Sequence, residues 1–240
     1  MLYNKYYELN ISLYLFNNIS YRESFEKVST LLNYSFNRSK YMSKLHKNKG
    51  FKHYSFSGMY PVEKDYVYKG DEIYNILIRS YNKTIIDEIQ KCMVNLKNKD
   101  FVITNVEKRE WVNKKIDFVD SLTPTVGILK RNNKPCNWNI MKDDKMLLEN
   151  QLYNNIIKKY NVLNDTNIMS KYQDIIKMIQ IKNNCPIYIQ YKGTSVMGYK
   201  IRIYFQDNEI AQNIANLASV EGIGSKNSSL GMGFVKSYFI

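Results

Sequence analysis

The hydrophobic residues of this chain switch repeatedly between the two-residue spacing of a strand and the roughly 3.6-residue spacing of a helix. Residues 4–16 alternate as a strand does. Ser20 and Glu23 have the S-x-x-E spacing of a capping box, which predicts that a helix begins at Ser20. The apolar positions that follow have helical spacing: Phe25, Val28, Leu31 and Leu32. The chain is therefore predicted to begin with a strand and then a helix.

The rest of the first half continues this pattern. A short helix is predicted through Tyr41 and Leu45, ending before Gly50, a common helix terminator. Two strand-like stretches follow at 51–57 and 71–81. Thr84 is then predicted to cap a helix with apolar positions Ile85, Ile86, Ile89, Met93 and Leu96, before a strand at 100–112. The order strand, helix, strand, strand, helix, strand is that of the ferredoxin-like fold.

The second half repeats the order less regularly. The elements expected there are a strand at 116–129, a helix opened by Asp143 or Asp144, strands at 174–181, 186–192 and 197–205, a short helix capped by Asp207 or Asn208, and a last strand in MGFVKSYFI. The prediction is an α+β protein with two tandem ferredoxin-like (βαββαβ, RRM-like) domains. They would span residues 1–115 and 116–240, with a glycine-rich loop at 222–233 in the second.

Composition excludes several classes of protein. Of the 240 residues, 44% are hydrophobic, enough to bury a core and too many for a disordered chain. No apolar run approaches the roughly 18 residues needed to cross a bilayer, and the opening MLYNKYYELN does not read as a secretory signal. We therefore expect a cytoplasmic protein with no membrane partner. Cys92, Cys136 and Cys185 are far apart, which argues against a zinc site or a disulfide framework.

The chain is strongly basic. Lys and Arg number 35 against 22 Asp and Glu, a formal net charge of +13. A basic balance favours a polyanionic partner. Lys outnumbers Arg 29 to 6 and there are only three Ala, a bias typical of an AT-rich genome, which adds Lys without selection for binding. The distribution of the charge is therefore more informative than its sum.

Between Glu26 and Glu63 the chain contains no acidic residue. This acid-free window holds the basic residues Lys27, Arg38, Lys40, Lys44, Lys47, Lys49 and Lys52. Aromatic residues are interleaved with them: Tyr34, Phe36, Tyr41, Phe51 and Tyr54. Basic groups hold phosphates and aromatic faces stack on unpaired bases, so the window suits RNA or single-stranded DNA. The alternative is a solvated, Lys-rich helix and loop.

Both histidines of the chain lie in this window. His46 precedes Lys52 by six residues, and a turn through Gly50 could bring the two to one site. Imidazole titrates near neutral pH and can act as a general base or acid, while an ammonium can stabilise charge developing on a phosphate. With Tyr or Ser donors added, these groups suffice for RNA cleavage by its own 2′-hydroxyl. His46 could equally be a surface residue, and His53 is expected to be packed or to face solvent.

The segment GIGSKNSSLGMG at 222–233 has two Gly-x-Gly pairs separated by six residues. It is neither a dinucleotide fingerprint nor a P-loop. Closely spaced glycines let a backbone lie against a ligand and can form an anion-binding nest. Lys226, Asn227, Ser228 and Ser229 add donors suited to phosphate and sugar. The alternative is a flexible loop before the last strand.

Three segments together resemble a known family. ANLASVEGIGSKNSSLGMGFVK, at the C-terminal end, looks like the signature of the CRISPR-associated repeat-processing endoribonucleases of the repeat-associated mysterious protein (RAMP) superfamily. LHKNKGFKHYSFS resembles the catalytic stretch of that family, and LLENQLYNNIIKKYN is similar to the helix that starts its second half. The spacer between the Gly-x-Gly pairs is one residue longer here than is usual in the family.

The resemblance implies two tandem ferredoxin-like folds and metal-independent cleavage of precursor CRISPR RNA within each repeat. The products would carry 2′,3′-cyclic phosphate and 5′-hydroxyl ends. His46 matches the catalytic histidine and Lys52 the lysine that supports the phosphate, with Tyr34 or Tyr41 as the assisting tyrosine. RNA-binding residues would be Lys44, Lys47, Lys49, Gly222, Gly224, Lys226, Asn227, Ser228, Gly231 and Gly233. No cofactor or metal is implied.

Two other readings remain open at this point. One is a non-catalytic subunit that holds CRISPR RNA within an effector complex. The other is a metal-dependent nuclease, suggested by the acidic pairs Asp71–Glu72, Asp87–Glu88 and Asp143–Asp144. Each pair lies at an expected helix or strand start, where Asp and Glu are ordinary caps. The expected partner is repeat RNA, with effector subunits as possible further partners, for a monomer or a homodimer.

Overall fold

A computed structural model describes residues 4–240, and residues 1–3 lie outside the described part. In the first part of the chain the elements are β1 (Lys5–Leu15), β2 (Ile19–Ser20), α1 (Tyr21–Phe36), α2 (Lys40–Lys47), β3 (Tyr54–Phe56), β4 (Val67–Tyr68), β5 (Ile73–Ser80), α3 (Lys83–Met93) and β6 (Phe101–Val112). Those that follow are β7 (Ile116–Ser121), β8 (Ile128–Arg131), β9 (Lys134–Asn137), α4 (Lys145–Asn164), α5 (Tyr172–Ile175), β10 (Ile176–Ile181), β11 (Ile187–Tyr191), β12 (Thr194–Gly198), β13 (Ile201–Phe205), α6 (Glu209–Glu221), α7 (Asn227–Leu230) and β14 (Val235–Phe239).

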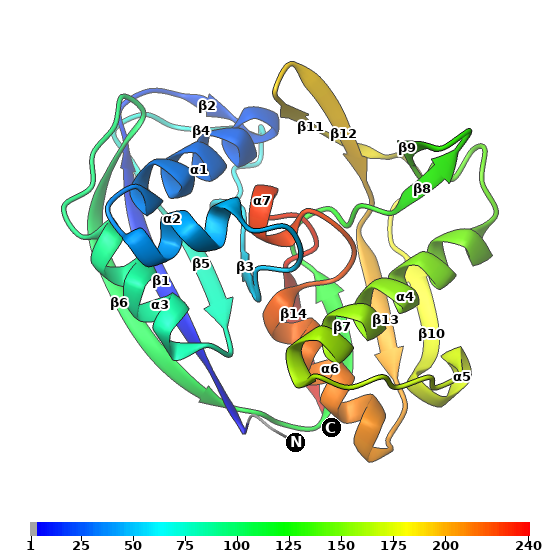
Figure 1. The fold of residues 1–240 in the computed structure, drawn as a ribbon. Helices are drawn as coiled ribbons and strands as arrows, with labels where there is room; N and C mark the ends of the chain where they lie inside the picture. The colour runs from blue at the N-terminus through cyan, green and yellow to red at the C-terminus, as the bar shows by residue number, and fades with distance from the viewer. Residues whose placement is uncertain (1–3) are drawn as a thin grey trace.

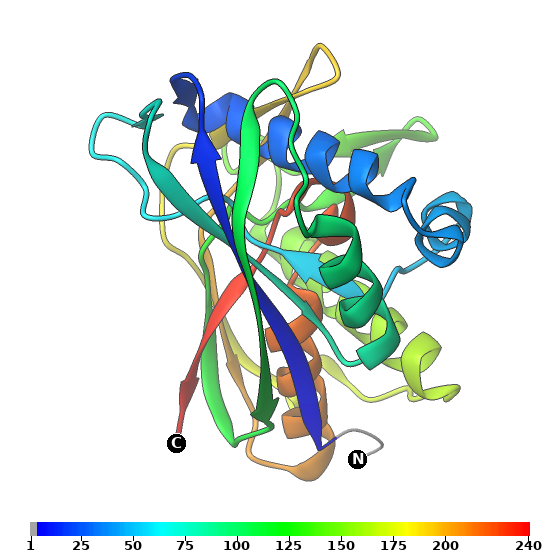
Figure 2. The ribbon, with the colours of Figure 1, turned by 90° about the vertical axis from the view of Figure 1, so that its left-hand side faces the viewer.

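The first sheet has the order β3-β5-β1-β6, and all its neighbours are antiparallel. Helices α1 and α3 pack on one face (Figures 1 and 2). On β1 the alternate residues Leu9, Ile11 and Leu13 are fully buried beneath the helices. Helix α1 buries the residues that its spacing predicted: Phe25, Val28, Leu31 and Leu32. This is the ferredoxin-like βαββαβ topology, with the core between the sheet and its helices.

The second sheet repeats the topology. Its order is β10-β13-β7-β14, again antiparallel, and α6 packs against β7 and β14 with α4 beside it (Figure 1). Leu152 and Ile156 from α4 meet Ile203 and Ile214 in a separate buried cluster. The prediction of two tandem ferredoxin-like folds is confirmed for the described residues.

Several local predictions need adjustment. The N-cap of α3 is Asn82, whose Oδ1 accepts from the backbone N–H of Thr84, so the predicted Thr84 cap is wrong. Helix α3 ends at Met93, short of Leu96. The strand expected over 51–57 is only β3, because His53 has a left-handed φ of 54° that interrupts an extended backbone. The residues before β10 form the short helix α5 instead of a strand.

The two sheets are built from residues on either side of a short connection between Val112 and Ile116. A domain boundary near residue 115 stays a prediction, because the two halves also share packing. Ile189 and Val196, on the β11–β12 hairpin of the second half, are buried in the hydrophobic cluster of the first. Leu230, from the glycine-rich segment, lies in the same cluster. Within residues 4–240, none of the helices has the length and apolar content required to cross a membrane.

Candidate active site and RNA interface

Helix α2 presents His46 on the surface. Ser39 caps the helix by accepting from the backbone N–H of Met42, and Met42 is the one residue of α2 that is buried in the core. His46 lies in the last turn, is exposed, and approaches the buried ring of Phe36 with ring centroids 6.2 Å apart. Met42, with the partly buried Leu45, orients the helix so that its basic residues and His46 remain accessible to a ligand.

Lys52 returns to the end of the same helix. Its Nζ donates to the carbonyl oxygen of Leu45 at 2.6 Å and also to that of Asn48. The predicted turn through Gly50 therefore brings Lys52 to the residue that immediately precedes His46. An ammonium has three donors, and the two carbonyls use two of them, which leaves one for a ligand. Partial burial lowers the pKa of Lys52.

The two candidate tyrosines are both accessible. Tyr34, on α1, is 54% exposed and Tyr41, on α2, is 41% exposed. Tyr41 and His46 are five residues apart on one helix, which puts their side chains about 140° apart around the helix axis. Phe36 is the residue of α1 whose ring is recorded beside His46, and Tyr34 lies about 200° from Phe36 around the α1 axis, so the helix geometry does not choose between the two tyrosines.

Some basic residues of the acid-free window are held by other protein groups, and others are exposed to solvent. Lys27 forms an ion pair with Asp100 at 2.6 Å, and Arg38 donates to the carbonyls of Cys92 and Val94 near the end of α3. Lys44, Lys47 and Lys49 are exposed. The structure records no ion pair for these three among residues 4–240. They form an accessible basic patch around His46.

The glycine-rich segment is more deeply buried than its sequence suggests. All four glycines have positive φ and are buried: Gly222, Gly224, Gly231 and Gly233. A Cβ on Gly224 would lie 2.7 Å from the Val126 carbonyl oxygen, and one on Gly231 would lie 2.6 Å from the Phe56 ring. The expectation that these glycines let a bare backbone lie against a ligand is therefore corrected, because each is enclosed by protein atoms.

Asn227 also faces inward. Its Nδ2 donates to the carbonyls of Ile223 and Met232, and its Oδ1 accepts from Nζ of Lys159 at 2.7 Å. These bonds close the segment on itself, so the amide of Asn227 has a structural function in this arrangement. Lys226 and Ser228 are half-exposed and Ser229 is exposed. They are the residues of the segment that a ligand could reach.

The segment lies against the elements of the first half. The Tyr54 hydroxyl donates to the Ser228 carbonyl at 3.0 Å, and the Ser29 hydroxyl donates to the Ser229 carbonyl at 2.6 Å. Nζ of Lys226 lies 5.4 Å from the centre of the Tyr191 ring on β11. The glycine-rich segment is thus held beside β3, α1 and the β11–β12 hairpin, close to the stretch that carries Lys52 and His53.

Two charged residues of this region were not identified from the sequence. Glu221, the last residue of α6, is 2% exposed and its Oε1 lies 2.8 Å from Nδ1 of His53. Lys159 on α4 is 4% exposed and donates to the carbonyls of Glu221 and Gly222 as well as to Asn227. Lys159 follows Leu152 by seven residues and Ile156 by three, so its position on the apolar stripe of α4 was a readable signal. No sequence pattern connects Glu221 to His53.

Most of the acidic side chains in these pairs form ion pairs or hydrogen bonds within the protein. Asp87 pairs with Lys83 and Lys108, and Glu88 with Lys91. Asp144 caps α4. Asp143 accepts from Arg131 and from the backbone N–H of Asn139, and Asp71 accepts from the Tyr14 hydroxyl. In the described residues, no three His, Cys, Asp or Glu side chains gather in a way that could hold a metal ion.

The fold and the site define a protein with two ferredoxin-like units, in which a glycine-rich segment packs against α1 and β3 and a short basic helix carries an exposed histidine. Residues 106–237 match the family model described as CRISPR associated protein Cas6, C-terminal. This is more than half of the chain, and the chain therefore belongs to the Cas6 family. No curated protein matches the chain.

Solved structures share the fold over nearly the whole chain. One, titled as a RAMP protein binding different RNA substrates, superposes with a TM-score of 0.74 at 17% identity, covering 97% of this chain and 99% of that one. A second, titled CRISPR associated protein Cas6, has a TM-score of 0.70 at 16% identity and covers 97% and 99%. A third is a Cas6-related protein from Pyrococcus furiosus, with a TM-score of 0.68 at 19% identity and 96% and 98% coverage. At these identities the likeness establishes the fold.

Proposed function

We propose that this protein is a metal-independent endoribonuclease that cleaves precursor CRISPR RNA within its repeats. Membership of the Cas6 family supports the substrate class. A solved structure with the same fold is titled a Cas6 product complex. The observation that carries the chemistry is the contact of Lys52 with the Leu45 carbonyl, since it brings an ammonium within one residue of His46.

The reaction is an internal transesterification. The RNA 2′-oxygen forms a bond to the adjacent phosphorus, and the bond from phosphorus to the 5′-oxygen of the next nucleotide breaks. The 2′-hydroxyl loses a proton and the leaving 5′-oxygen gains one, so the products are a 2′,3′-cyclic phosphate and a 5′-hydroxyl. His46 transfers one of these protons. The remaining donor of Lys52 stabilises the charge that builds on the phosphate oxygens.

Tyr34 or Tyr41 assists by donating a hydrogen bond to the phosphate. Both tyrosines are exposed, and the choice between them is made by experiment. Replacing each tyrosine in turn by Phe removes only the hydroxyl. The larger loss of cleavage rate identifies the tyrosine that assists.

The RNA backbone follows the basic patch on α2 and continues to the glycine-rich segment. Lys44, Lys47 and Lys49 attract phosphates without regard to sequence. Lys226, Ser228 and Ser229 are accessible donors of the segment, which contacts α1 and β3. In this proposal Asn227 and the four glycines shape the segment and do not touch RNA, because they are buried.

Incubation of the purified protein with repeat RNA in excess EDTA tests the proposal. Cleavage at one position supports it if the terminal phosphate of the upstream product resists phosphatase until acid opens the cyclic ester. The downstream product should accept a 5′-phosphate from polynucleotide kinase without prior phosphatase treatment. Tight binding without cleavage would favour the alternative, a non-catalytic subunit that holds CRISPR RNA. Cleavage only after addition of a divalent cation would contradict metal independence. A cytoplasmic location, association with effector subunits and a monomeric or homodimeric state stay predictions.

A further inference from the structure

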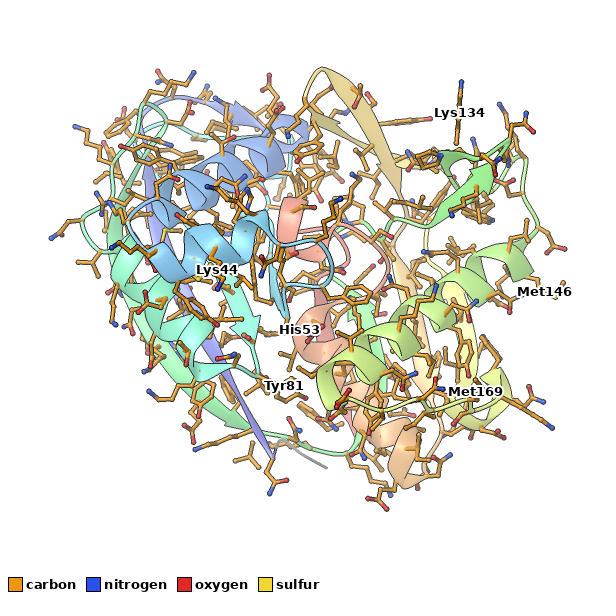
Figure 3. All side chains as sticks on the ribbon, viewed as in Figure 1. Lys44, His53, Tyr81, Lys134, Met146 and Met169 are labelled. Carbon is orange, nitrogen blue, oxygen red and sulfur yellow. The ribbon has the colours of Figure 1, made fainter. Side chains whose placement is uncertain are left out.

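His53 and Glu221 form a buried pair at the junction of the two halves of the molecule. His53 precedes β3 and Glu221 ends α6, and Figure 3 shows His53 at the centre of the molecule between these elements. Nδ1 of His53 lies 2.8 Å from Oε1 of Glu221. The carboxylate is 2% exposed, whereas the imidazole is 21% exposed. One edge of the ring is thus fixed inside the protein and another part reaches the surface.

This geometry determines which nitrogen is available. When Nδ1–H donates to a carboxylate, the neutral ring carries its lone pair on Nε2, and the carboxylate stabilises the imidazolium that forms when Nε2 accepts a proton. The arrangement of a buried carboxylate, an oriented imidazole and a reacting group is the general pattern of an activated acid or base. His46 has no carboxylate beside it among the recorded contacts of residues 4–240.

The backbone at His53 is also constrained. Its φ of 54° is in the left-handed region, which a residue with a side chain adopts at a cost in free energy. The His53 carbonyl accepts from the Ser80 hydroxyl at 2.6 Å, which holds this conformation. The strained residue follows Lys52 directly and precedes Tyr54, which contacts the glycine-rich segment. His53 therefore lies between the two parts of the molecule that the proposed function assigns to RNA.

We propose that His53, oriented by Glu221, is a second proton-transfer residue of the RNA-cleaving site and acts together with His46. This inference rests on the proposed function. One histidine accepts the proton of the 2′-hydroxyl as its oxygen bonds to phosphorus, and the other, protonated, gives a proton to the 5′-oxygen as its bond to phosphorus breaks. The two histidines exchange protonation states over one turnover, so no metal or external acid is consumed.

The charged groups that face the pair come from three elements. Glu221 is on α6, Lys159 lies on α4 with its Nζ on the Glu221 carbonyl, and Lys52 adjoins His53 in sequence. Burial raises the pKa of Tyr81, which follows β5, and the charge of Glu221 also raises it. Glu221 is the one carboxylate recorded against His53 among residues 4–240.

The test measures single-turnover cleavage of bound repeat RNA against pH for wild type, His53→Ala and Glu221→Gln. His53→Ala is expected to lose about 10²–10⁴-fold in rate with wild-type RNA affinity. Added imidazole should restore part of that rate, since a small base can occupy the space. Glu221→Gln keeps an acceptor for Nδ1–H without its charge, so the pH profile of its cleavage rate should differ from that of wild type.

The outcomes separate this inference from the proposed function. If wild type does not cleave repeat RNA, the proposed function fails before any variant is compared. If wild type cleaves and His53→Ala retains its rate within about twofold, only the role of His53 is overturned. If imidazole does not restore the lost rate and the melting temperature also falls, the pair of His53 and Glu221 stabilises the fold and does not transfer a proton. That result would also overturn the role proposed for His53. Glu209→Gln, an exposed carboxylate on the same helix, is the control and should leave the profile unchanged.

Discussion

The Glu221 carboxylate lies 2.8 Å from Nδ1 of His53, a residue 168 positions earlier in the chain. The contact joins the end of α6 to the stretch that carries Lys52, and it lies where the glycine-rich segment begins. The region proposed to hold and cut RNA is therefore assembled from both halves of the molecule. Substitutions at single residues can therefore test RNA binding, proton transfer and folding separately.

The first prediction concerns the basic patch on α2. Replacing Lys44, Lys47 and Lys49 together by Ala should weaken RNA binding and flatten its salt dependence, because each lost phosphate contact removes about 0.7 from the log–log slope on a single strand. The control replaces Lys64, Lys99 and Lys134, three exposed lysines, by Ala. Lys134 lies on the other side of the molecule from Lys44 (Figure 3). Equal slopes for the two triple variants would exclude α2 from the RNA path.

The second prediction concerns His46. His46→Ala should lower the single-turnover rate by about 10²–10⁴-fold, the usual contribution of general acid–base catalysis. RNA affinity and the melting temperature should stay near wild type, because His46 is exposed and its recorded contact is the edge of Phe36. Rate measurements with enzyme in excess over labelled RNA provide the check. Wild-type cleavage by this variant would remove His46 from the mechanism.

The third prediction concerns the glycines, which we expect to serve the fold. Gly233 and Gly193 both have positive φ, but a Cβ on Gly233 would overlap the Ile223 carbonyl, whereas Gly193 has open space around it. Gly193→Ala should cost about 1 kcal/mol from the left-handed backbone alone. Gly233→Ala should cost about 1–3 kcal/mol more through overpacking. Denaturant unfolding distinguishes them, and equal losses would contradict the enclosed geometry.

The fourth prediction concerns the buried Lys159. Burial lowers its pKa from the ordinary 10.5 to about 8, with Glu221 partly opposing the change. Between these two pKa values the unfolded chain binds more protons than the folded protein, so this residue adds stability as pH rises. The free energy of unfolding of wild type, relative to Lys159→Met, should rise by about 2 kcal/mol from about pH 7.5 to about pH 9.5.

Lys158 provides the matched control for that experiment, because it adjoins Lys159 on α4 and is exposed. Lys158→Met should follow the wild-type pH dependence. A wild-type curve parallel to that of Lys159→Met over this interval would show that Lys159 keeps an ordinary pKa in the folded protein. In that case, its hydrogen bonds to the Gly222 carbonyl and Asn227 would be those of a fully charged ammonium.

Local patterns predict the elements whose signals lie within a few residues of one another. The alternation of residues 4–16 and the cap at Ser20 act within a few positions, and both are present in the structure. The prediction of a Thr84 cap overlooks Asn82, two residues earlier, although Asn is the stronger N-cap residue type. The short β3 depends on the backbone of His53, which a strand-like composition does not reveal.

The site was predictable only where its contacts are local. Lys52 reaches Leu45 across seven positions, through a turn marked by Gly50, so sequence reasoning could join it to the His46 region. Glu221 and His53 are joined by the packing of two sheets, which no spacing encodes. The glycines were read as ligand-facing because a glycine required by close packing and one required by a ligand have the same appearance in a sequence.

The most direct test of the account uses a repeat RNA with a single 2′-deoxy sugar at the cleavage position. Attack by the 2′-hydroxyl requires that oxygen, so the deoxy RNA should bind wild-type protein with the affinity of the unmodified RNA and remain intact in EDTA. The unmodified RNA should be cut under the same conditions, leaving a 2′,3′-cyclic phosphate. Cleavage of the deoxy RNA at that position would show that another nucleophile acts, and would contradict the proposed mechanism.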